Sequence, residues 1–427
     1  MKMLQIGFYI CLSVLENPMT TANIYYFNPT CELAVANGSF SYQPPLLLQE
    51  MERDLAILPF VFCTENDFVL TETPPSTVFL QKLEKFGFEL PQFCSLAELE
   101  SLPTGSFDAI FPWGWSPAAH FRIKNLKEKS GTQFKESPVF QWNNEHKLLF
   151  ERSTSLDFLN GLLENQPPDW FINKEMVGEK VTSCDEIDSL LKKHSPLVLK
   201  APMSSSGRGI QIIRKTQLNT SNKQWISGVL KQQKYLIAEP YLEKLLDLSF
   251  QFQVLSSSEI EYLGYSIFET NSNGQYSGTF IHPNLGKFIS EKYVPELEFR
   301  IEETAKVLKS ALEKSAYATE HRGLLGVDAL VFGNEDHLIM QPCIEINSRM
   351  NMGILTMFLE RRIHPDSTGK FELFYDSAYG YCDFVDTQLQ LNPPKFKQGK
   401  IYSGFLPLVE PNAKTKFGAY ISLGEAK

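Results

Sequence analysis

The chain has 427 residues, which corresponds to two or three domains or to one large composite domain. Hydrophobic residues make up 43% and charged residues 21%, so a sizeable core can be buried and wholesale disorder is excluded. The net charge of −10 argues against a protein that binds the phosphate backbone of nucleic acids and against a polybasic membrane contact.

The start of the chain and its cysteines bear on where the protein resides. Met3–Leu15 is apolar, but only Lys2 precedes it and no small-residue cleavage site follows, so a start at Met19 is favoured over a secretion signal. The seven cysteines include no CxxC pair, which fits a reducing compartment. No apolar run reaches the ~18–20 residues that span a bilayer. We therefore expect a cytoplasmic protein without a membrane partner.

The first third of the chain alternates predicted strands and helices. Ile24–Phe27 and Phe107–Phe111 are predicted strands, and Ile57–Cys63 is expected to be extended. Leu46–Leu55 and Ser76–Phe86 are predicted helices. This alternation is typical of an α/β domain with a parallel sheet, which places ligands in the loops after its strands.

Two such loops carry residues suited to ligand binding. In the loop Asn28–Asn37, Glu32 and Asn37 could bind a second substrate, although a turn formed by the neighbouring proline and glycine explains the segment as well. In the loop Pro112–Ser116, Trp113 could wall a substrate slot, and simple loop packing is the competing interpretation.

The rest of the chain has the mixed order of an α+β region. Four helices are predicted, at Asn144–Glu151, Leu156–Leu163, Cys184–Lys193 and Leu297–Ser315. Eight strands are predicted, at Leu197–Leu199, Ile210–Ile213, Tyr235–Ala238, Leu248–Leu255, Glu261–Ile267, Leu324–Phe332, His337–Ile346 and Gly399–Leu406.

A lysine at the end of a predicted strand begins the first group of candidate site residues. Lys200 is followed by a loop of small residues, Ser204, Ser205, Ser206, Gly207, Arg208 and Gly209. Small residues allow backbone N–H groups to approach an anion, and the lysine adds a positive charge. The loop lacks the GK[ST] sequence of a Walker loop, and a flexible hairpin is the alternative interpretation.

The second group follows another buried strand. Glu239, Pro240 and Tyr241 stand at its end, where an apolar slot with a few polar groups could hold a purine base. Asp247 lies eight residues after Glu239 and could accept hydrogen bonds from ribose hydroxyls. A solvated glutamate at a strand end explains the first residue equally simply.

The third group consists of acidic and amide side chains on two predicted strands. Glu345 and Asn347 alternate on one face of a strand, and a hairpin centred on Asn334-Glu335 places Asp328 on the same face by pairing it with Gln341. Which residue lies directly opposite Asp328 depends on the register, which the sequence leaves open. Three oxygen ligands suit Mg²⁺. Arg349 projects on the same side, where it could clamp a carboxylate or a phosphate.

In this order, the three groups resemble the ATP-grasp superfamily over roughly residues 142–359. The resemblance implies that Lys147 and Lys200 hold the nucleotide phosphates beneath the loop 204–209. It also implies that Glu239 and its neighbours form the adenine hinge and that Asp247 binds the ribose. By the same resemblance, Asp328, Glu345 and Asn347 are magnesium ligands and Arg349 lies near an acyl phosphate.

The resemblance implies a fold and a domain order as well. An N-terminal α/β domain resembling a pre-ATP-grasp domain is expected over residues 22–140, followed by a two-subdomain ATP-grasp domain over 141–375 and by strands over 376–427 that complete it.

The expected function is an ADP-forming ligase that joins a carboxylate to an amine, with ATP and Mg²⁺ or Mn²⁺ as cofactors. Its expected partners are small-molecule substrates and no nucleic acid, and a homodimer is among the assemblies allowed. A small-molecule kinase and a non-catalytic nucleotide-binding protein are the alternatives.

Overall fold

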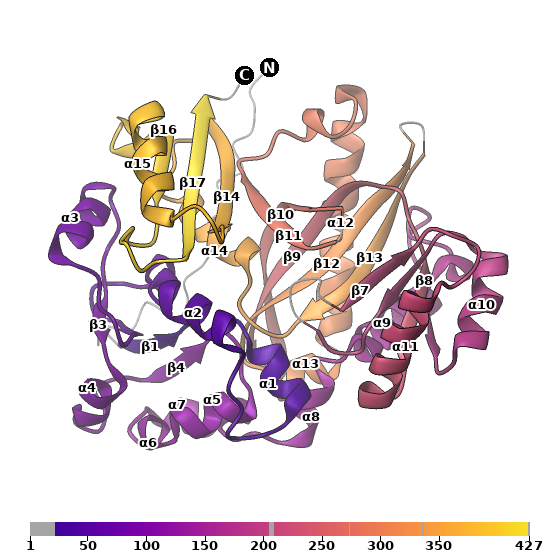
Figure 1. The fold of residues 1–427 in the computed structure, drawn as a ribbon, viewed down its shortest axis with the longest axis horizontal. Helices are drawn as coiled ribbons and strands as arrows, with labels where there is room; N and C mark the ends of the chain where they lie inside the picture. The colour runs from indigo at the N-terminus through magenta and orange to yellow at the C-terminus, as the bar shows by residue number, and fades with distance from the viewer. Residues whose placement is uncertain (1–21, 205–208, 273, 335–336, 426–427) are drawn as a thin grey trace.

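The computed structural model describes residues 22–204, 209–272, 274–334 and 337–425. The apolar segment Met3–Leu15, and with it the prediction about the start of the chain, lies outside these residues. So do four residues of the predicted loop, which are Ser205, Ser206, Gly207 and Arg208. Three sheets organise the described chain (Figure 1).

The first sheet is parallel and has the order β3-β2-β1-β4. Its strands are β1 (Asn23–Tyr26), β2 (Phe68–Leu70), β3 (Gln92–Cys94) and β4 (Ala109–Pro112). The helices around it are α1 (Cys31–Asn37), α2 (Leu46–Asp54), α3 (Thr77–Lys85), α4 (Leu96–Ser101), α5 (Pro117–Arg122), α6 (Lys124–Lys127) and α7 (Thr132–Lys135), and a 3₁₀ turn η2 (Pro138–Phe140) follows. The predicted parallel sheet is therefore confirmed.

One expectation in this domain is wrong. Ile57–Cys63 is not extended, because Leu58–Phe62 forms the 3₁₀ helix η1 with Pro59 in its first turn. An apolar run indicates burial but does not distinguish a strand from a helical turn, and proline fixes a φ that suits the start of a helix. The next strand of the sheet is instead β2, at Phe68–Leu70.

The second sheet is antiparallel and has nine strands in the order β13-β12-β9-β10-β11-β14-β17-β16-β15. These are β9 (Lys244–Ser256), β10 (Glu259–Thr270), β11 (Tyr276–Ile281), β12 (Gly323–Asn334), β13 (His337–Asn347), β14 (Ser367–Tyr375), β15 (Lys395–Lys397), β16 (Lys400–Pro407) and β17 (Phe417–Glu425). Its helices and 3₁₀ turns are α8 (Asn144–Leu148), α9 (Arg152–Glu164), η4 (Leu285–Lys287), η5 (Glu291–Tyr293), α12 (Val294–Leu312), α13 (Ala316–Glu320), α14 (Met352–Glu360) and α15 (Tyr381–Leu391).

A helical repeat of apolar residues explains how α12 covers this sheet. Leu297, Ile301 and Leu308 are buried at helical spacing on one side of α12 and share a core with Phe250 and Val327 of the sheet.

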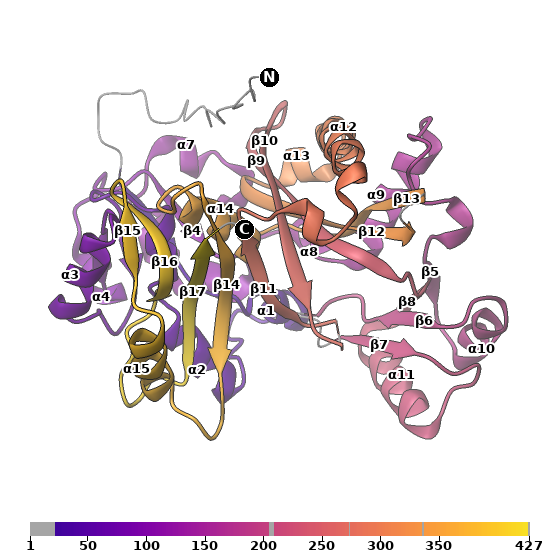
Figure 2. The same ribbon diagram turned by 90° about the horizontal axis from the view of Figure 1, so that it is seen from above.

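The third sheet is small and antiparallel, with the order β5-β8-β6-β7. It comprises β5 (Glu179–Val181), β6 (Leu197–Lys200), β7 (Ile210–Ile213) and β8 (Leu236–Pro240), together with η3 (Lys174–Met176), α10 (Cys184–Lys193) and α11 (Thr220–Gln233). Figure 2 shows these elements as a lobe at one side of the large sheet. The predicted fold class, a parallel N-terminal sheet followed by a mixed two-subdomain region, is confirmed.

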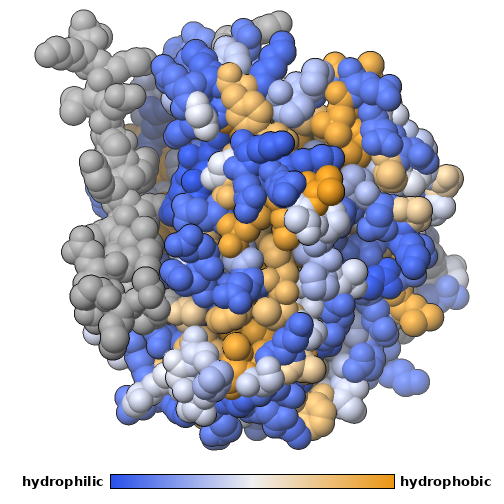
Figure 3. Space-filling model, turned by 90° about the vertical axis from the view of Figure 1, so that its left-hand side faces the viewer, coloured by the Kyte–Doolittle hydropathy of each residue, from blue (hydrophilic) through white to orange (hydrophobic). Residues whose placement is uncertain are grey.

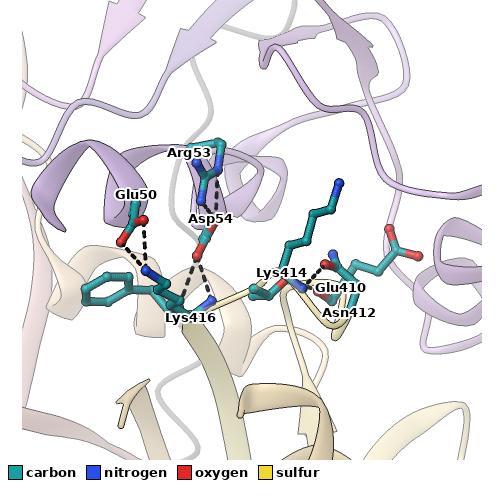
Figure 4. Close-up of polar contacts among 9 residues, drawn as sticks. Glu50, Arg53, Asp54, Glu410, Asn412, Lys414 and Lys416 are labelled. Atoms are coloured by element: carbon teal, nitrogen blue, oxygen red, sulfur yellow. Dashed lines mark hydrogen bonds and ion pairs between the residues drawn. The ribbon is translucent and has the colours of Figure 1, made fainter. Parts of the chain in front are cut away.

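The N-terminal domain is fixed to the C-terminal strands. Phe27 and Trp113 share one core with Phe405 and Ile421. At the rim of this core, the carboxylate of Asp54 accepts hydrogen bonds from the backbone N–H groups of Lys416 (2.8 Å) and Phe417 (3.2 Å) (Figure 4). The ammonium of Lys416 binds Glu50 of the same helix at 2.9 Å. This packing holds the loops of the parallel sheet against the large sheet.

The surface is mostly polar where Figure 3 displays it. On that side hydrophobic residues form a narrow strip near the middle and a few separate groups among hydrophilic ones. Apolar exposure of this extent is ordinary for folded proteins. None of the helices in the described part of the chain has the length and apolar character needed to cross a membrane.

Candidate active site

Two adjoining cavities of about 310 Å³ each border the large sheet, the first against the small sheet and the second against loops of the N-terminal domain. We call them the hinge cavity, lined by Lys200, Glu239 and Tyr241 among others, and the carboxylate cavity, lined by Asp328, Glu345 and Arg349 among others. The two cavities share four lining residues, which are Ile210, Thr270, Gly274 and Ile344. One extended ligand could therefore occupy both.

Lys200 and Glu239 form a buried ion pair in the hinge cavity. Lys200 is the last residue of β6 and Glu239 lies on the adjacent strand β8, so antiparallel pairing brings them together. Their side chains are only 9% and 14% exposed. Each charge therefore compensates the other, because an isolated charge would be costly at this depth. Removing one partner would leave the other unpaired.

Apolar and aromatic side chains complete the hinge cavity. Pro240 and Tyr241 line it at the end of β8, and the guanidinium of Arg214 lies 5.3 Å from the centre of the Tyr241 ring. Gln341 on β13 also lines this cavity, and its buried amide oxygen has no hydrogen-bond partner among the described residues. A flat ring with hydrogen-bonding edges would suit such a slot.

The predicted magnesium ligands come together in the carboxylate cavity. The register of β12 and β13 places Asp328 directly opposite Glu345. Asn347 donates a hydrogen bond from its amide nitrogen to Asp328 at 2.9 Å, and the Ser249 hydroxyl donates a second one at 2.7 Å. Burial raises the pKa of Asp328 to about 6 and the Glu345 carboxylate adds to this rise, while the two hydrogen bonds oppose it.

The predicted pairing partner of Asp328 is wrong. Asn334 pairs with His337 and Leu330 with Gln341, so the hairpin is centred one residue later than predicted, and an irregularity between Asp328 and Leu330 shifts the register further so that Asp328 faces Glu345. Symmetry about the turn could not reveal this shift, because a bulge is a local departure from regular pairing. The three side chains nevertheless share one side of the hairpin.

Arg152, which is not among the predicted site residues, connects the two parts of the site. It begins α9 and is 5% exposed. Its guanidinium donates hydrogen bonds to the carbonyl of Ala201 and the hydroxyl of Ser204, both at 2.7 Å, and binds Glu345 at 3.1 Å. A cation in the first turn of a helix is unfavourable beside the positive end of the helix dipole. An arginine at this position in the sequence therefore indicates that its side chain has an anionic partner elsewhere.

The predicted phosphate-loop residues lie partly inside the described chain. Ser204 lines the carboxylate cavity, and a Cβ at Gly209 would overlap the Ser204 side chain, so glycine allows this close approach. Lys147 lies on α8 and is not among the described residues that line either cavity. The assignment of Lys147 to the phosphates therefore stays a prediction.

Asp247, the predicted ribose ligand, is 8% exposed and lines the carboxylate cavity. It forms an ion pair with Lys244, and the Thr270 hydroxyl lies 3.4 Å from the same carboxylate oxygen. Burial raises its pKa, and these two neighbours oppose the rise. Since Lys244 and Thr270 line the hinge cavity, Asp247 stands where the two cavities meet.

Arg349 is held by a residue from the N-terminal domain. Its Nε donates a hydrogen bond to Glu32 at 2.8 Å, and its guanidinium also donates to the backbone carbonyl of Met350 at 3.0 Å. Glu32 and Trp113 line the carboxylate cavity, so both loops after the parallel strands reach it. Asn37, the other candidate in the first loop, is not among its described lining residues.

The donor set suits a hard divalent ion that also binds a ligand. In the described part of the chain, no three His, Cys, Asp or Glu side chains are grouped to hold a metal. Asp328 and Glu345 supply carboxylate oxygens, and the amide oxygen of Asn347 is available because its nitrogen is the group that binds Asp328. Mg²⁺ is commonly bound by one or two carboxylates together with water and phosphate oxygens. The residues present therefore fit this ion.

Solved structures of other proteins match this chain in three dimensions. No protein-family model and no curated protein matches the chain. Biotin carboxylase from Campylobacter jejuni, solved as a β-γ-ATP complex, matches with a TM-score of 0.51 and 12% identity over 95% of this chain and 87% of that chain. N5-carboxyaminoimidazole synthetase from Staphylococcus aureus, complexed with ADP, matches with a TM-score of 0.46 and 14% identity over 94% of this chain and 93% of that chain. At this identity the likeness to biotin carboxylase shows the fold alone, and that fold is the predicted ATP-grasp fold.

Proposed function

We propose that the protein is an ATP-dependent ligase that activates a carboxylate as an acyl phosphate and joins it to an amine, releasing ADP and phosphate. One observation carries the proposal. The cavity with Lys200, Glu239 and Tyr241 adjoins the cavity that holds Asp328, Glu345 and Arg349. A nucleotide lying across both would place its base in the first and its terminal phosphates in the second, with Lys200 beside the first phosphate.

The chemistry explains why such a site is needed. A carboxylate is a poor acyl donor because its leaving group would be oxide. Transfer of the γ-phosphoryl group to it gives an acyl phosphate, from which phosphate leaves readily when an amine attacks. Catalysis of phosphoryl transfer relies mainly on positioning and on charge stabilisation, which the charged residues of the carboxylate cavity supply.

The residues of the hinge cavity and of its junction with the carboxylate cavity bind and orient the nucleotide. Glu239, Pro240 and Tyr241 form the base slot, and Asp247 accepts hydrogen bonds from the ribose hydroxyls. Lys200 and Arg152 place positive charge beside the phosphates, and Ser204 and Gly209 bring backbone N–H groups to them. Lys147, Ser205, Ser206, Gly207 and Arg208 remain predictions.

The carboxylate cavity supplies the groups around the reacting phosphate. Asp328, Glu345 and Asn347 would hold Mg²⁺, which when bound offsets negative charge on the phosphate oxygens. Arg349 binds the carboxylate substrate and stabilises charge on the oxygens of the acyl group. The fold shared with a biotin carboxylase whose structure is a β-γ-ATP complex supports ATP as the phosphoryl donor.

Two alternatives make different predictions. A kinase would leave the phosphoryl group on a hydroxyl of its product. A nucleotide-binding protein without activity would not need the partly buried pair Asp328 and Glu345, since opposing carboxylates are costly unless a cation joins them. We propose that the ligase acts on small-molecule substrates in the cytoplasm, and a homodimer is one assembly that it could form.

An ADP-release screen over pairs of carboxylic acids and amines tests the proposal, with products identified by mass spectrometry. We expect at least one pair to give ADP, phosphate and the mass of an amide, and Glu345→Gln to abolish the signal. ADP with a phosphorylated hydroxyl product would establish a kinase. ATP binding without turnover on any pair would contradict the ligase.

A further inference from the structure

We propose that Glu32 binds the amine of the acceptor substrate through its second carboxylate oxygen, Oε2. This inference rests on the proposed ligase function and names the group that recognises its second substrate. It assigns a role to the loop after β1, which the nucleotide-binding residues leave without one.

Glu32 is held rigidly at the cavity. It lies in α1, directly after the first parallel strand, and is 7% exposed. The side chain of Asn28 bridges to the second loop, with its amide nitrogen 2.8 Å from the Gly114 carbonyl and its oxygen 3.3 Å from the Gly114 N–H. The Thr30 hydroxyl donates to Glu52 from the other side at 2.6 Å. These contacts fix the backbone that carries Glu32.

The two oxygens of Glu32 have different environments. Oε1 accepts the hydrogen bond from Arg349 at 2.8 Å. Oε2 is buried and has no hydrogen-bond partner among the described residues. A carboxylate oxygen left without a donor in such a position is costly, so a buried acceptor of this kind indicates a missing donor. Because Glu32 lines the carboxylate cavity, a bound substrate can supply that donor.

The charge of the site selects which substrate group meets Glu32. The carboxylate substrate and the phosphates are anionic and would be repelled by it, whereas Arg349 attracts them. An amine carries N–H donors and meets no such repulsion. Glu32 and Arg349 thus divide the site, so that the guanidinium faces the acid and the carboxylate faces the amine. Pro29 and Trp113 line the same cavity, so the acceptor class is an amine with an apolar neighbouring group.

The test compares Glu32→Gln with wild type, using the acid and amine found in the ADP-release screen. The amide side chain keeps the size but loses the charge-assisted bond, so the KM for the amine should rise about tenfold or more. The KM values for ATP and the acid should stay within about twofold. Acid-dependent hydroxamate formation with hydroxylamine should persist, because the activation step does not use the amine.

Glu65→Gln is the matched control, because Glu65 is an exposed glutamate of the same N-terminal domain that is not among the described lining residues of either cavity. It should leave all three KM values unchanged. An unchanged amine KM in folded Glu32→Gln would overturn the inference, and so would an equal rise for the acid, since Glu32 would then act only on Arg349. If Glu32→Gln does not fold, Glu32→Asp gives the same comparison by drawing the carboxylate back. Absence of ADP from wild type with every pair would refute the ligase itself, and the inference with it.

Discussion

Replacement of Lys200 by alanine should weaken ATP binding more than it weakens the fold. The ammonium of Lys200 is the cation of the hinge cavity that pairs with Glu239. In the proposed complex it also faces the phosphates. The mutation therefore removes an attraction for the nucleotide and leaves the negative charge of Glu239 unopposed.

The size of the effect follows from these two contributions. A hydrogen bond to a charged group contributes about 1.5–3 kcal/mol, which corresponds to a loss of ATP affinity of roughly 10- to 150-fold. The uncompensated Glu239 adds repulsion toward the phosphates. In the Glu239→Gln background, Lys200→Ala should therefore cost less affinity than it does in wild type, and the difference measures the coupling between the two residues.

Isothermal titration calorimetry with a non-hydrolysable ATP analogue and Mg²⁺ measures the affinity, and thermal unfolding verifies the fold. Lys231→Ala is the control, because Lys231 is an exposed lysine on α11 of the same lobe. Its substitution should leave affinity unchanged. Unchanged ATP affinity in folded Lys200→Ala would refute the assignment of Lys200 to the phosphates.

Three further predictions concern the metal site, pH and stability. Glu345→Gln should spare ATP binding but lower turnover, measured by ADP release, by at least a factor of about 100. The reason is that a metal ligand loses its charge where transition-state charge develops. Wild-type turnover of the variant at saturating Mg²⁺ would contradict this prediction. Burial lowers the pKa of His321 from 6.5 to about 4. Between pH 6.5 and about 4, His321 therefore takes up a proton in the unfolded chain but not in the folded one. The free energy of unfolding should therefore fall by about 1.4 kcal/mol per pH unit on acidification across that window, and urea titrations of His321→Gln should show a correspondingly smaller slope. Asp54→Ala should lower the free energy of unfolding in urea by about 1–3 kcal/mol, because the backbone N–H groups of Lys416 and Phe417 lose their acceptor. A decrease no larger than that of a surface substitution would show that water replaces the carboxylate as acceptor.

Local chemistry made much of the fold predictable. Cys184–Lys193 has acidic residues in its first turn and lysines in its last, and it forms α10 over the same residues. Ile210–Ile213 likewise forms β7 as predicted. Such patterns depend on neighbours in the sequence, so they are visible without the fold. Ile57–Cys63 failed because its apolar side chains are compatible with either kind of element.

The site was predictable where its residues share a strand. Glu345 and Asn347 alternate along β13, so their common face follows from strand geometry. The pairing of Asp328 depends on the exact centre of the hairpin and on an irregularity in β12 and β13, and it was not predictable. Arg152 reaches Glu345 because α9 packs against β13, where the Ile346 N–H donates to Ser155 at 2.9 Å. Such a contact between distant segments leaves only a weak trace in the sequence, the cation at a helix start.

The fate of the carboxylate oxygen tests the central claim most directly. The acid identified in the screen is labelled with ¹⁸O in its carboxylate, and the released phosphate is analysed by mass spectrometry together with the nucleotide product. Acyl phosphate formation transfers one carboxylate oxygen to the phosphate, so we predict ADP and phosphate that carries one ¹⁸O for each amide formed. AMP as the nucleotide product, or phosphate without the label, would contradict the proposed mechanism.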